Sequence, residues 1–261
     1  MVVAIRKADR RGDDVVGRRQ PCEDYRRAVA RADVRHVVAG GHMHRGDQAR
    51  GVAGIEIRYD LTDFGSQATK FSDRQIAAME TLKPQAVFVD RDGTLIEHIP
   101  YLCDPASVTL LPGVQEALWR LQAESVRLFL FTNQSGVGRG LFTMADVEAV
   151  NQRMIDLLGL GSEPFAGICI APEMPGQPSC YRKPSPRFIH EMLDVYGIEA
   201  EAAWMIGDSP VDWEAGIAAG IMTAAIERAT GESQSKERSK KYGVATYSSL
   251  LEWVNCCCSR R

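Results

Sequence analysis

The most informative stretch of this sequence is Phe88-Val89-Asp90-Arg91-Asp92-Gly93-Thr94-Leu95. A short apolar run predicts a buried strand, and it leads directly into two aspartates separated by one arginine. Gly93 then permits a sharp turn that brings both carboxylates into one pocket. Two like charges this close persist only where a cation or a proton relieves their repulsion, and such a pair suits a nucleophile beside a general acid/base. A solvated turn of two acids is the alternative.

Outward from this stretch, short apolar runs alternate with helical patterns. We expect strands at 86–89, 126–132, 167–171, 203–206 and 221–226, and helices at 113–124, 144–158, 186–196 and 213–219. This alternation is typical of βαβ units, so it predicts a parallel sheet with helices packed on its faces.

Polar groups follow four of the five predicted strands. Besides Asp90 they are Thr132 after the second strand, Lys183 downstream of the third, and Asp208 with Asp212 after the fourth. Ligands of an open parallel sheet bind at the carboxyl ends of its strands, so we expect these groups to converge there. A hydroxyl suits a phosphate oxygen, a lysine offsets charge on a transferred phosphoryl group, and carboxylates suit Mg²⁺.

Each of these later signals has an ordinary alternative when it is taken alone. Thr132 would fit an ordinary polar loop, and Lys183 would fit a surface basic pair. Asp208 and Asp212 would fit a helix N-terminus enriched in aspartate. Their order and spacing favour a single site, with 42 residues from Asp90 to Thr132, 51 from there to Lys183, and 25 more to Asp208.

In this order the motifs resemble those of the haloacid-dehalogenase-like superfamily, which match Asp90-x-Asp92-Gly-Thr, Thr132, Lys183 and Gly207-Asp208-x-x-x-Asp212. The resemblance implies an α/β fold, a Rossmann-like parallel sheet in the order 5-4-1-2-3 with helices on both faces. It implies a phosphatase with Asp90 as nucleophile, an aspartyl-phosphate intermediate, and Asp92 as general acid/base. It also implies Mg²⁺ bound by the Asp90 side chain, the Asp92 main-chain oxygen and Asp208, with Asp212 in a supporting role. The short segment between Asp92 and Thr132 leaves no room for a large cap domain.

A narrower resemblance, from about residue 85 to 254, is to the histidinol-phosphatase-like branch of this superfamily. It rests on the DRDGTL stretch, on Thr132-Asn-Gln-Ser-Gly-Val-Gly-Arg-Gly140 and on Arg182-Lys-Pro. The resemblance implies a small sugar-phosphate substrate, foremost the 7-phosphate of heptose 1,7-bisphosphate, and hence a role in carbohydrate metabolism. Thr132 and Lys183 would then contact the phosphate, while Asn133 and Arg182 would reach towards the rest of the substrate.

Two positions depart from that branch. Many of its members carry a zinc loop, whereas the corresponding stretches here are Ala171-Pro-Glu173 and Ser179-Cys-Tyr181. Cys169 and Cys180 supply too few ligands for a closed zinc site, so we expect no structural zinc. The heptose enzymes usually have lysine where this chain has Ser209.

Composition and charge divide the chain into a basic extension (1–80), a phosphatase domain (81–255) and a Cys/Arg tail (256–261). Residues 1–50 hold twelve Lys/Arg against seven Asp/Glu, so the rest of the chain, whose total charge is -3, is acidic at about -8. An acidic domain disfavours a nucleic-acid partner. We interpret the extension as partly disordered, and we expect a cytoplasmic monomer without a membrane anchor.

Three rival functions stay open. Histidinol-phosphate phosphatase belongs to the same branch, and a polynucleotide 3′-phosphatase shares the Thr-Asn-Gln sequence. A phospho-aspartate receiver combines an acidic cluster, a threonine and a lysine on a parallel sheet, but its acceptor aspartate follows the third strand, where this chain has Ala171-Pro172.

Overall fold

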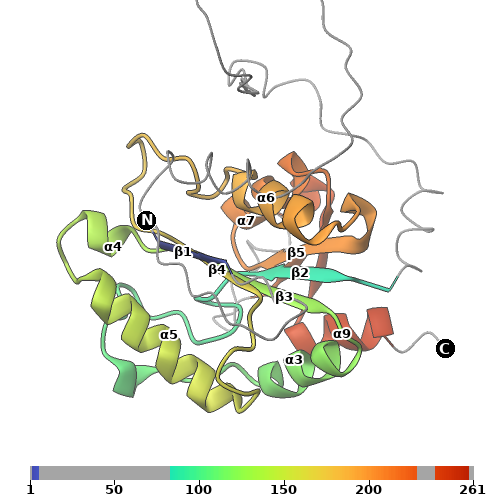
Figure 1. The fold of residues 1–261 in the computed structure, drawn as a ribbon, viewed down its shortest axis with the longest axis horizontal. Coiled ribbons are helices and arrows are strands. Elements are labelled where there is room, and N and C mark those ends of the chain that lie inside the picture. The colour runs from blue at the N-terminus through green and yellow to red at the C-terminus, as the bar shows by residue number, and fades with distance from the viewer. Residues whose placement is uncertain (1, 6–82, 228–238, 259–261) are drawn as a thin grey trace, which may run out of the picture. The chain divides into compact units, whose positions relative to one another are not determined.

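The central feature of the computed structural model is a sheet with strand order β1-β4-β3-β2-β5-β6-β7 (Figure 1). The structure describes residues 2–5, 83–227 and 239–258. The strands are β1 (Val2–Ile5), β2 (Ala86–Val89), β3 (Arg127–Asn133), β4 (Gly167–Ala171), β5 (Ala203–Gly207), β6 (Met222–Ile226) and β7 (Ala245–Tyr247). Strands β2 to β7 run parallel, and β1 pairs antiparallel with β4. The five predicted strands therefore follow the order β6-β5-β2-β3-β4, which confirms the expected 5-4-1-2-3 topology.

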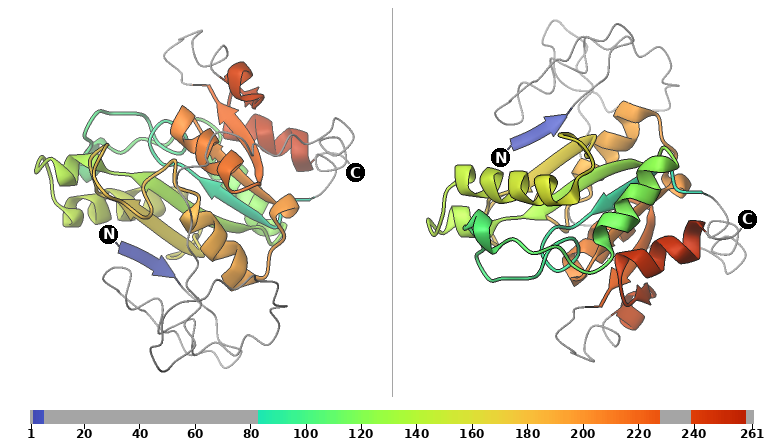
Figure 2. Two further views of the ribbon diagram at one scale, coloured as in Figure 1. Left: turned by 90° about the horizontal axis from the view of Figure 1, so that it is seen from above. Right: turned by 90° about the horizontal axis from the view of Figure 1, so that it is seen from below.

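Helices cover both faces of this sheet (Figures 1 and 2). They are α3 (Val114–Ala123), α4 (Ser135–Gly138), α5 (Met144–Leu158), α6 (Arg187–Tyr196), α7 (Pro210–Ala218) and α9 (Leu250–Cys258), with single 3₁₀ turns at η1 (Pro105–Ser107) and η2 (Ala200–Ala202). Successive side chains of a strand point to opposite faces, so β2 contributes to two cores. Val87 and Val89 pack with residues of α3, α5 and α9, whereas Phe88 packs with Phe188 of α6 and Ala215 of α7.

The predicted bounds of α5 hold, whereas α7 begins at Pro210, three residues before its predicted start at 213. Thr143 and Asp146 form a reciprocal capping box at the start of α5, and Gly159 adopts a left-handed conformation at its end. Both features satisfy backbone groups that a helix terminus otherwise leaves unpaired. This helix supplies Asn151, a buried polar residue that contacts the site described below.

Two elements near the C-terminus were not predicted from the sequence. Strand β7 extends the sheet beyond β6, and α9 buries Trp253 and Val254 against the core. Helix α9 continues to Cys258, past the predicted start of the tail at residue 256. Among the residues that the structure describes, no helix is long and apolar enough to cross a membrane.

The basic extension contributes one described element. Val2 to Ile5 pair with Ile170 to Gly167 along the edge of β4, a strand that the sequence analysis did not anticipate. The sequence pattern also predicts a helix near residues 23–38, a strand near 55–59 and a helix starting at 72. All three lie outside the described residues. That the extension is not needed for folding stays a prediction.

We expect residues 1–70 to be dispensable for catalysis, because no candidate site residue lies there. Two truncations, of residues 1–5 and of residues 1–70, should each lower the thermal midpoint by less than about 8 °C, or roughly 2 kcal/mol for a domain of this size. Thermal unfolding beside the full chain measures this. A larger decrease for the longer truncation alone would show that residues 6–70 are structural, and a larger decrease for both would assign that role to β1.

Candidate active site

The site lies where the chain leaves β2. Asp90 is 7% exposed, and its backbone N–H donates to the carbonyl of Ile206 on the neighbouring strand β5. Gly93 then turns the chain with a φ of 87°, and a Cβ built on it would lie 2.3 Å from Asp208 Oδ2. Only glycine allows this turn to approach the second acidic motif so closely.

Lys183 connects the acidic residues of the site. Its Nζ lies 2.5 Å from Asp90 Oδ1 and 2.6 Å from Asp212 Oδ1, and it donates to the carbonyl of Phe131 at 2.7 Å. Lys183 is 2% exposed and Asp212 is 1% exposed, so water offers little screening of these charges. The predicted convergence of residues from distant motifs is therefore present for these three side chains.

Burial and neighbouring charges shift the titration of these groups. Burial raises the pKa of Asp90 to about 7; Lys183 opposes the rise, and the charges of Asp212 and Asp92 add to it. The pKa of Asp212 is raised mainly by burial, against the influence of Lys183. Burial also opposes the charged form of Lys183, but the carboxylates of Asp212 and Asp90 raise its pKa.

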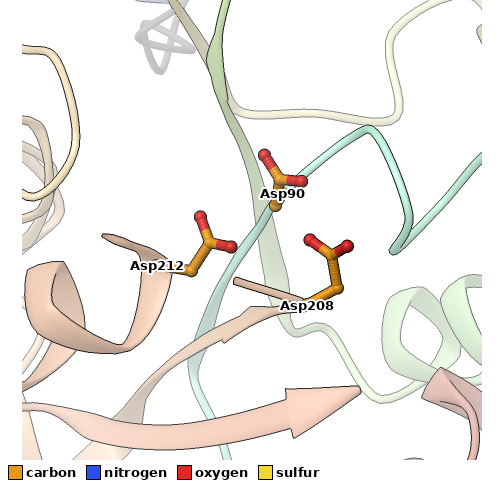
Figure 3. A group of neighbouring side chains, drawn as sticks. All are labelled: Asp90, Asp208 and Asp212. Carbon is orange, nitrogen blue, oxygen red and sulfur yellow. The ribbon is translucent and has the colours of Figure 1, made fainter. Parts of the chain in front are cut away.

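Three carboxylates face a common space at this edge of the sheet (Figure 3). Asp90, Asp208 and Asp212 are all buried, and each offers an oxygen within 4.8 Å of the others. With all four groups ionised, these acids and Lys183 carry a formal charge of -2, which a divalent cation would offset. Hard, buried carboxylate oxygens are the donor set that Mg²⁺ prefers, so the residues present fit this ion.

Asp212 also has a local structural role at the start of α7. Its Oδ2 accepts from the backbone N–H of Ser209 at 3.0 Å. A Cβ on Gly207 would lie 2.4 Å from the Asp212 carboxyl carbon, so the glycine before Asp208 makes room for this side chain. Asp212 is thus held by both the helix start and Lys183.

Asp92 occupies a different environment from Asp90. Its Oδ2 accepts from Gln134 Nε2 at 2.8 Å and from Arg91 Nε at 3.1 Å, while Arg91 Nη2 donates to Oδ1 at 3.1 Å. Its side chain is 19% exposed, compared with 1% for that of Arg91. The carboxyl group is therefore oriented by neighbours and still open to solvent.

Gln134 links the first two motifs. The same Nε2 that donates to Asp92 also donates to Thr132 Oγ1 at 2.9 Å, and both Thr132 and Gln134 are buried. Because the Thr132 hydroxyl accepts this bond, its own proton is available for an acceptor in the site.

Asn133 supports the loop that carries Lys183. Its Nδ2 donates to the Lys183 carbonyl at 3.1 Å, and its Oδ1 accepts from the Lys183 N–H at 3.0 Å. Asn133 was expected to bind substrate, and this two-bond contact was not predicted from the sequence. The amide holds the end of β3 against the segment that follows β4.

Arg182 lies at the side of the site. Its Nη1 donates to the Glu173 carbonyl at 2.8 Å. Burial lowers its pKa, Glu173 opposes this, and Arg139 lowers it further. The loops after β3 and β4 thus bring two arginines close enough to repel each other.

The cysteines named in the sequence analysis are in different surroundings. Cys169 is buried on β4, and burial raises the pKa of its thiol, whereas Cys180 is exposed. A buried protonated thiol is a poor metal ligand, because thiolate is the form that binds zinc.

Three further residues contact the site and were not predicted from the sequence: Arg91, Gln134 and Asn151. Arg91 lies inside the DRDGTL stretch and Gln134 inside the Thr-Asn-Gln stretch, so both belong to motifs that were recognised in the sequence. An arginine between two acids, directly after an apolar strand pattern, was the signal available in the sequence for the first. Asn151 lies 60 residues from Arg91 in the chain, and only the fold brings the two together.

Comparisons with known proteins agree with this geometry. Two curated relatives share the name D-glycero-beta-D-manno-heptose-1,7-bisphosphate 7-phosphatase. The one from Rhodopseudomonas palustris is 33% identical over 143 residues, 52% of this chain and 79% of the relative. The one from Escherichia coli K12 is 31% identical over 150 residues, 55% of this chain and 78% of the relative.

Solved structures support the same fold. The crystal structure of D,D-heptose 1.7-bisphosphate phosphatase from B. bronchiseptica, complexed with magnesium and phosphate, matches with a TM-score of 0.62 at 24% identity. The match covers 68% of this chain and 99% of the B. bronchiseptica protein. At this identity the match is evidence for the fold alone.

The family assignment follows from a direct match. The model of the haloacid dehalogenase-like hydrolase family matches residues 53–220, more than half of the chain. Together with the phosphatase names of the relatives, this confirms the predicted family and the predicted enzyme class, a phosphatase. The chain belongs to the haloacid dehalogenase-like hydrolase family.

Proposed function

We propose that this chain hydrolyses a small phosphomonoester through an aspartyl-phosphate formed on Asp90. The observation that carries the proposal is the buried contact of Asp90 with Lys183, beside Asp208 and Asp212, at the carboxyl edge of the sheet. A nucleophilic carboxylate next to fixed positive charge suits attack on an anionic phosphoryl group.

In the first step an oxygen of Asp90 attacks phosphorus, and the bond from phosphorus to the leaving oxygen breaks with its electron pair on that oxygen. The carboxylic proton of Asp92 is transferred to the leaving oxygen, which departs as an alcohol. Lys183 offsets charge on the phosphoryl oxygens, and the hydroxyl proton of Thr132 is available to donate to one of them.

In the second step Asp92, now a carboxylate, takes a proton from water. The water oxygen forms a bond to phosphorus while the bond to Asp90 breaks, which restores the Asp90 carboxylate and releases phosphate. The two steps use Asp92 first as an acid and then as a base, so the enzyme returns to its starting protonation state.

Mg²⁺ would be held by the Asp90 side chain, the Asp92 main-chain oxygen and Asp208, with Asp212 supporting Lys183. When bound, the ion neutralises charge on the phosphoryl oxygens and orients them. The cluster of buried carboxylates supports Asp90 and Asp208 as ligands.

As the substrate we propose the 7-phosphate of D-glycero-D-manno-heptose 1,7-bisphosphate. The names of the relatives support this choice, as do the two neighbouring arginines Arg182 and Arg139, because a bisphosphate carries a second anion. We further propose that Arg182 and Asn133 contribute to substrate binding, and that the enzyme is a cytoplasmic monomer. Histidinol phosphate and a 3′-phosphorylated polynucleotide are the rival substrates.

Asp90→Asn should abolish turnover, with a loss of at least about a thousandfold, because the amide cannot form the acyl phosphate. Steady-state hydrolysis of p-nitrophenyl phosphate measures this. Asp156→Asn, the same change at an exposed position on α5, is the matched control and should leave turnover unaltered. An Asp90→Asn enzyme within tenfold of wild type would rule out Asp90 as the nucleophile.

EDTA should stop the activity and Mg²⁺ should restore it. Asp208→Asn should weaken Mg²⁺ binding at least about tenfold in isothermal titration calorimetry, since it replaces a charged ligand by a neutral amide. Asp194→Asn, on the exposed side of α6, serves as control. Elemental analysis should find no stoichiometric zinc; one zinc per chain would overturn that expectation.

A substrate screen separates the three phosphoesters. We expect the highest kcat/KM for heptose 1,7-bisphosphate, with little dependence on salt concentration. Nucleic-acid binding weakens steeply with salt, so a strongly salt-dependent activity on 3′-phosphorylated oligonucleotides would favour the polynucleotide substrate. Preference for histidinol phosphate would replace the heptose assignment within the same mechanism.

A further inference from the structure

Arg91 separates the two aspartates of the first motif and is almost fully buried, with 1% of its surface exposed. Burying a guanidinium is costly unless its donors are paired. Two of its nitrogens donate to the two oxygens of Asp92, and Nη1 donates to Asn151 Oδ1 at 2.9 Å. The planar guanidinium therefore binds the Asp92 carboxyl group through Nε and Nη2 and binds Asn151 of α5 through Nη1.

The donors around Asp92 are distributed unequally between its two oxygens. Oδ2 accepts from both Arg91 Nε and Gln134 Nε2 and also lies 3.0 Å from Arg91 Nη2. Within the described part of the chain, the hydrogen bond at Oδ1 comes from Arg91 Nη2 at 3.1 Å. A carboxylate oxygen has two lone-pair sites, so Oδ2 is saturated and Oδ1 retains capacity for one more proton or donor.

We infer that Arg91 is a positioning residue for Asp92, directing Oδ1 towards the reacting oxygen, and that Asn151 secures this arrangement from α5. The inference rests on the proposed role of Asp92 as general acid/base. A proton donor must lie within hydrogen-bond reach of the atom that it protonates, and a misplacement of about 1 Å reduces the rate roughly a hundredfold.

Arg91 is suited to this task by its geometry. A bidentate guanidinium fixes both the place and the rotation of a carboxylate plane, whereas an ammonium at the same point fixes neither. The alternative is a purely structural role, in which Arg91 only balances buried charge. A structural role predicts equal losses on all substrates, and a positioning role predicts losses that depend on the leaving group.

Two substrates of similar size separate these roles. p-Nitrophenyl phosphate releases a stabilised anion that needs no proton, whereas benzyl phosphate releases an alkoxide that does. The second-order constant kcat/KM reports the first, phosphorylating step, in which Asp92 is the acid. Arg91→Lys and Asn151→Ala should lower kcat/KM for benzyl phosphate at least about tenfold, and for p-nitrophenyl phosphate less than about threefold.

Asp92→Asn and Gln152→Ala complete the set of variants. Asp92→Asn should show the same selectivity with a larger loss, on the order of 10² to 10⁴. Gln152→Ala alters the exposed neighbour of Asn151 on α5 and should match wild type on both substrates. Thermal unfolding and Mg²⁺ titration of each variant identify loss of fold or metal, and Asn151→Ala keeps the test available if Arg91→Lys does not fold.

Selective losses for Arg91→Lys and Asn151→Ala would support the inference. Equal losses on both substrates, or wild-type kinetics, alongside a selective Asp92→Asn enzyme would overturn it and leave the proposed mechanism standing. A non-selective Asp92→Asn enzyme would instead refute the acid role of Asp92, and the inference would fall with it.

Discussion

Lys183 Nζ lies between Asp90 Oδ1, at 2.5 Å, and Asp212 Oδ1, at 2.6 Å, where all three side chains are almost fully buried. Taking such charges out of water costs several kcal/mol per ion unless each finds a partner. Removing the ammonium would leave two carboxylates facing each other and Asp208, so the acidic cluster depends on it. The loop that carries Lys183 must therefore be fixed in place, and two hydrogen bonds between the Asn133 side chain and the Lys183 backbone do this directly.

The parallel sheet makes this contact possible. Neighbouring strands β2, β3 and β5 end at the same edge, so Asp90, Thr132 and Asp208 lie along that edge although they are far apart in sequence. Apolar side chains on both faces of β2 anchor that edge, with Val87 and Val89 on one side and Phe88 on the other. The polar site therefore lies at the end of a strand whose side chains are anchored in two apolar cores.

The features that could be predicted from the sequence are those that depend on interactions between residues close together in the chain. The core strands and most helix bounds were predictable because hydrophobic periodicity and caps are local, as in α5. Strand β7 is short and half-buried, and α9 ends in a run of cysteines that resembled a tail, so neither gave a strong signal. The motif residues were predictable from order and spacing, but the contacts of Arg91 with Asn151 and of Asn133 with Lys183 depend on strand order, which no single motif specifies.

Asp90 and Asp92 are two residues apart yet have different partners, and this difference is the basis for separate roles. Asp90 is surrounded by Lys183 and two further carboxylates, an arrangement that suits a group that binds a cation and an anionic phosphoryl group. Asp92 contacts a guanidinium and a neutral amide, and it remains partly open to solvent. Two carboxyl groups placed in unlike environments are able to divide nucleophilic and proton-transfer work between them. Arg91 produces part of this division, because the residue that separates the two aspartates in sequence donates two hydrogen bonds to the second of them.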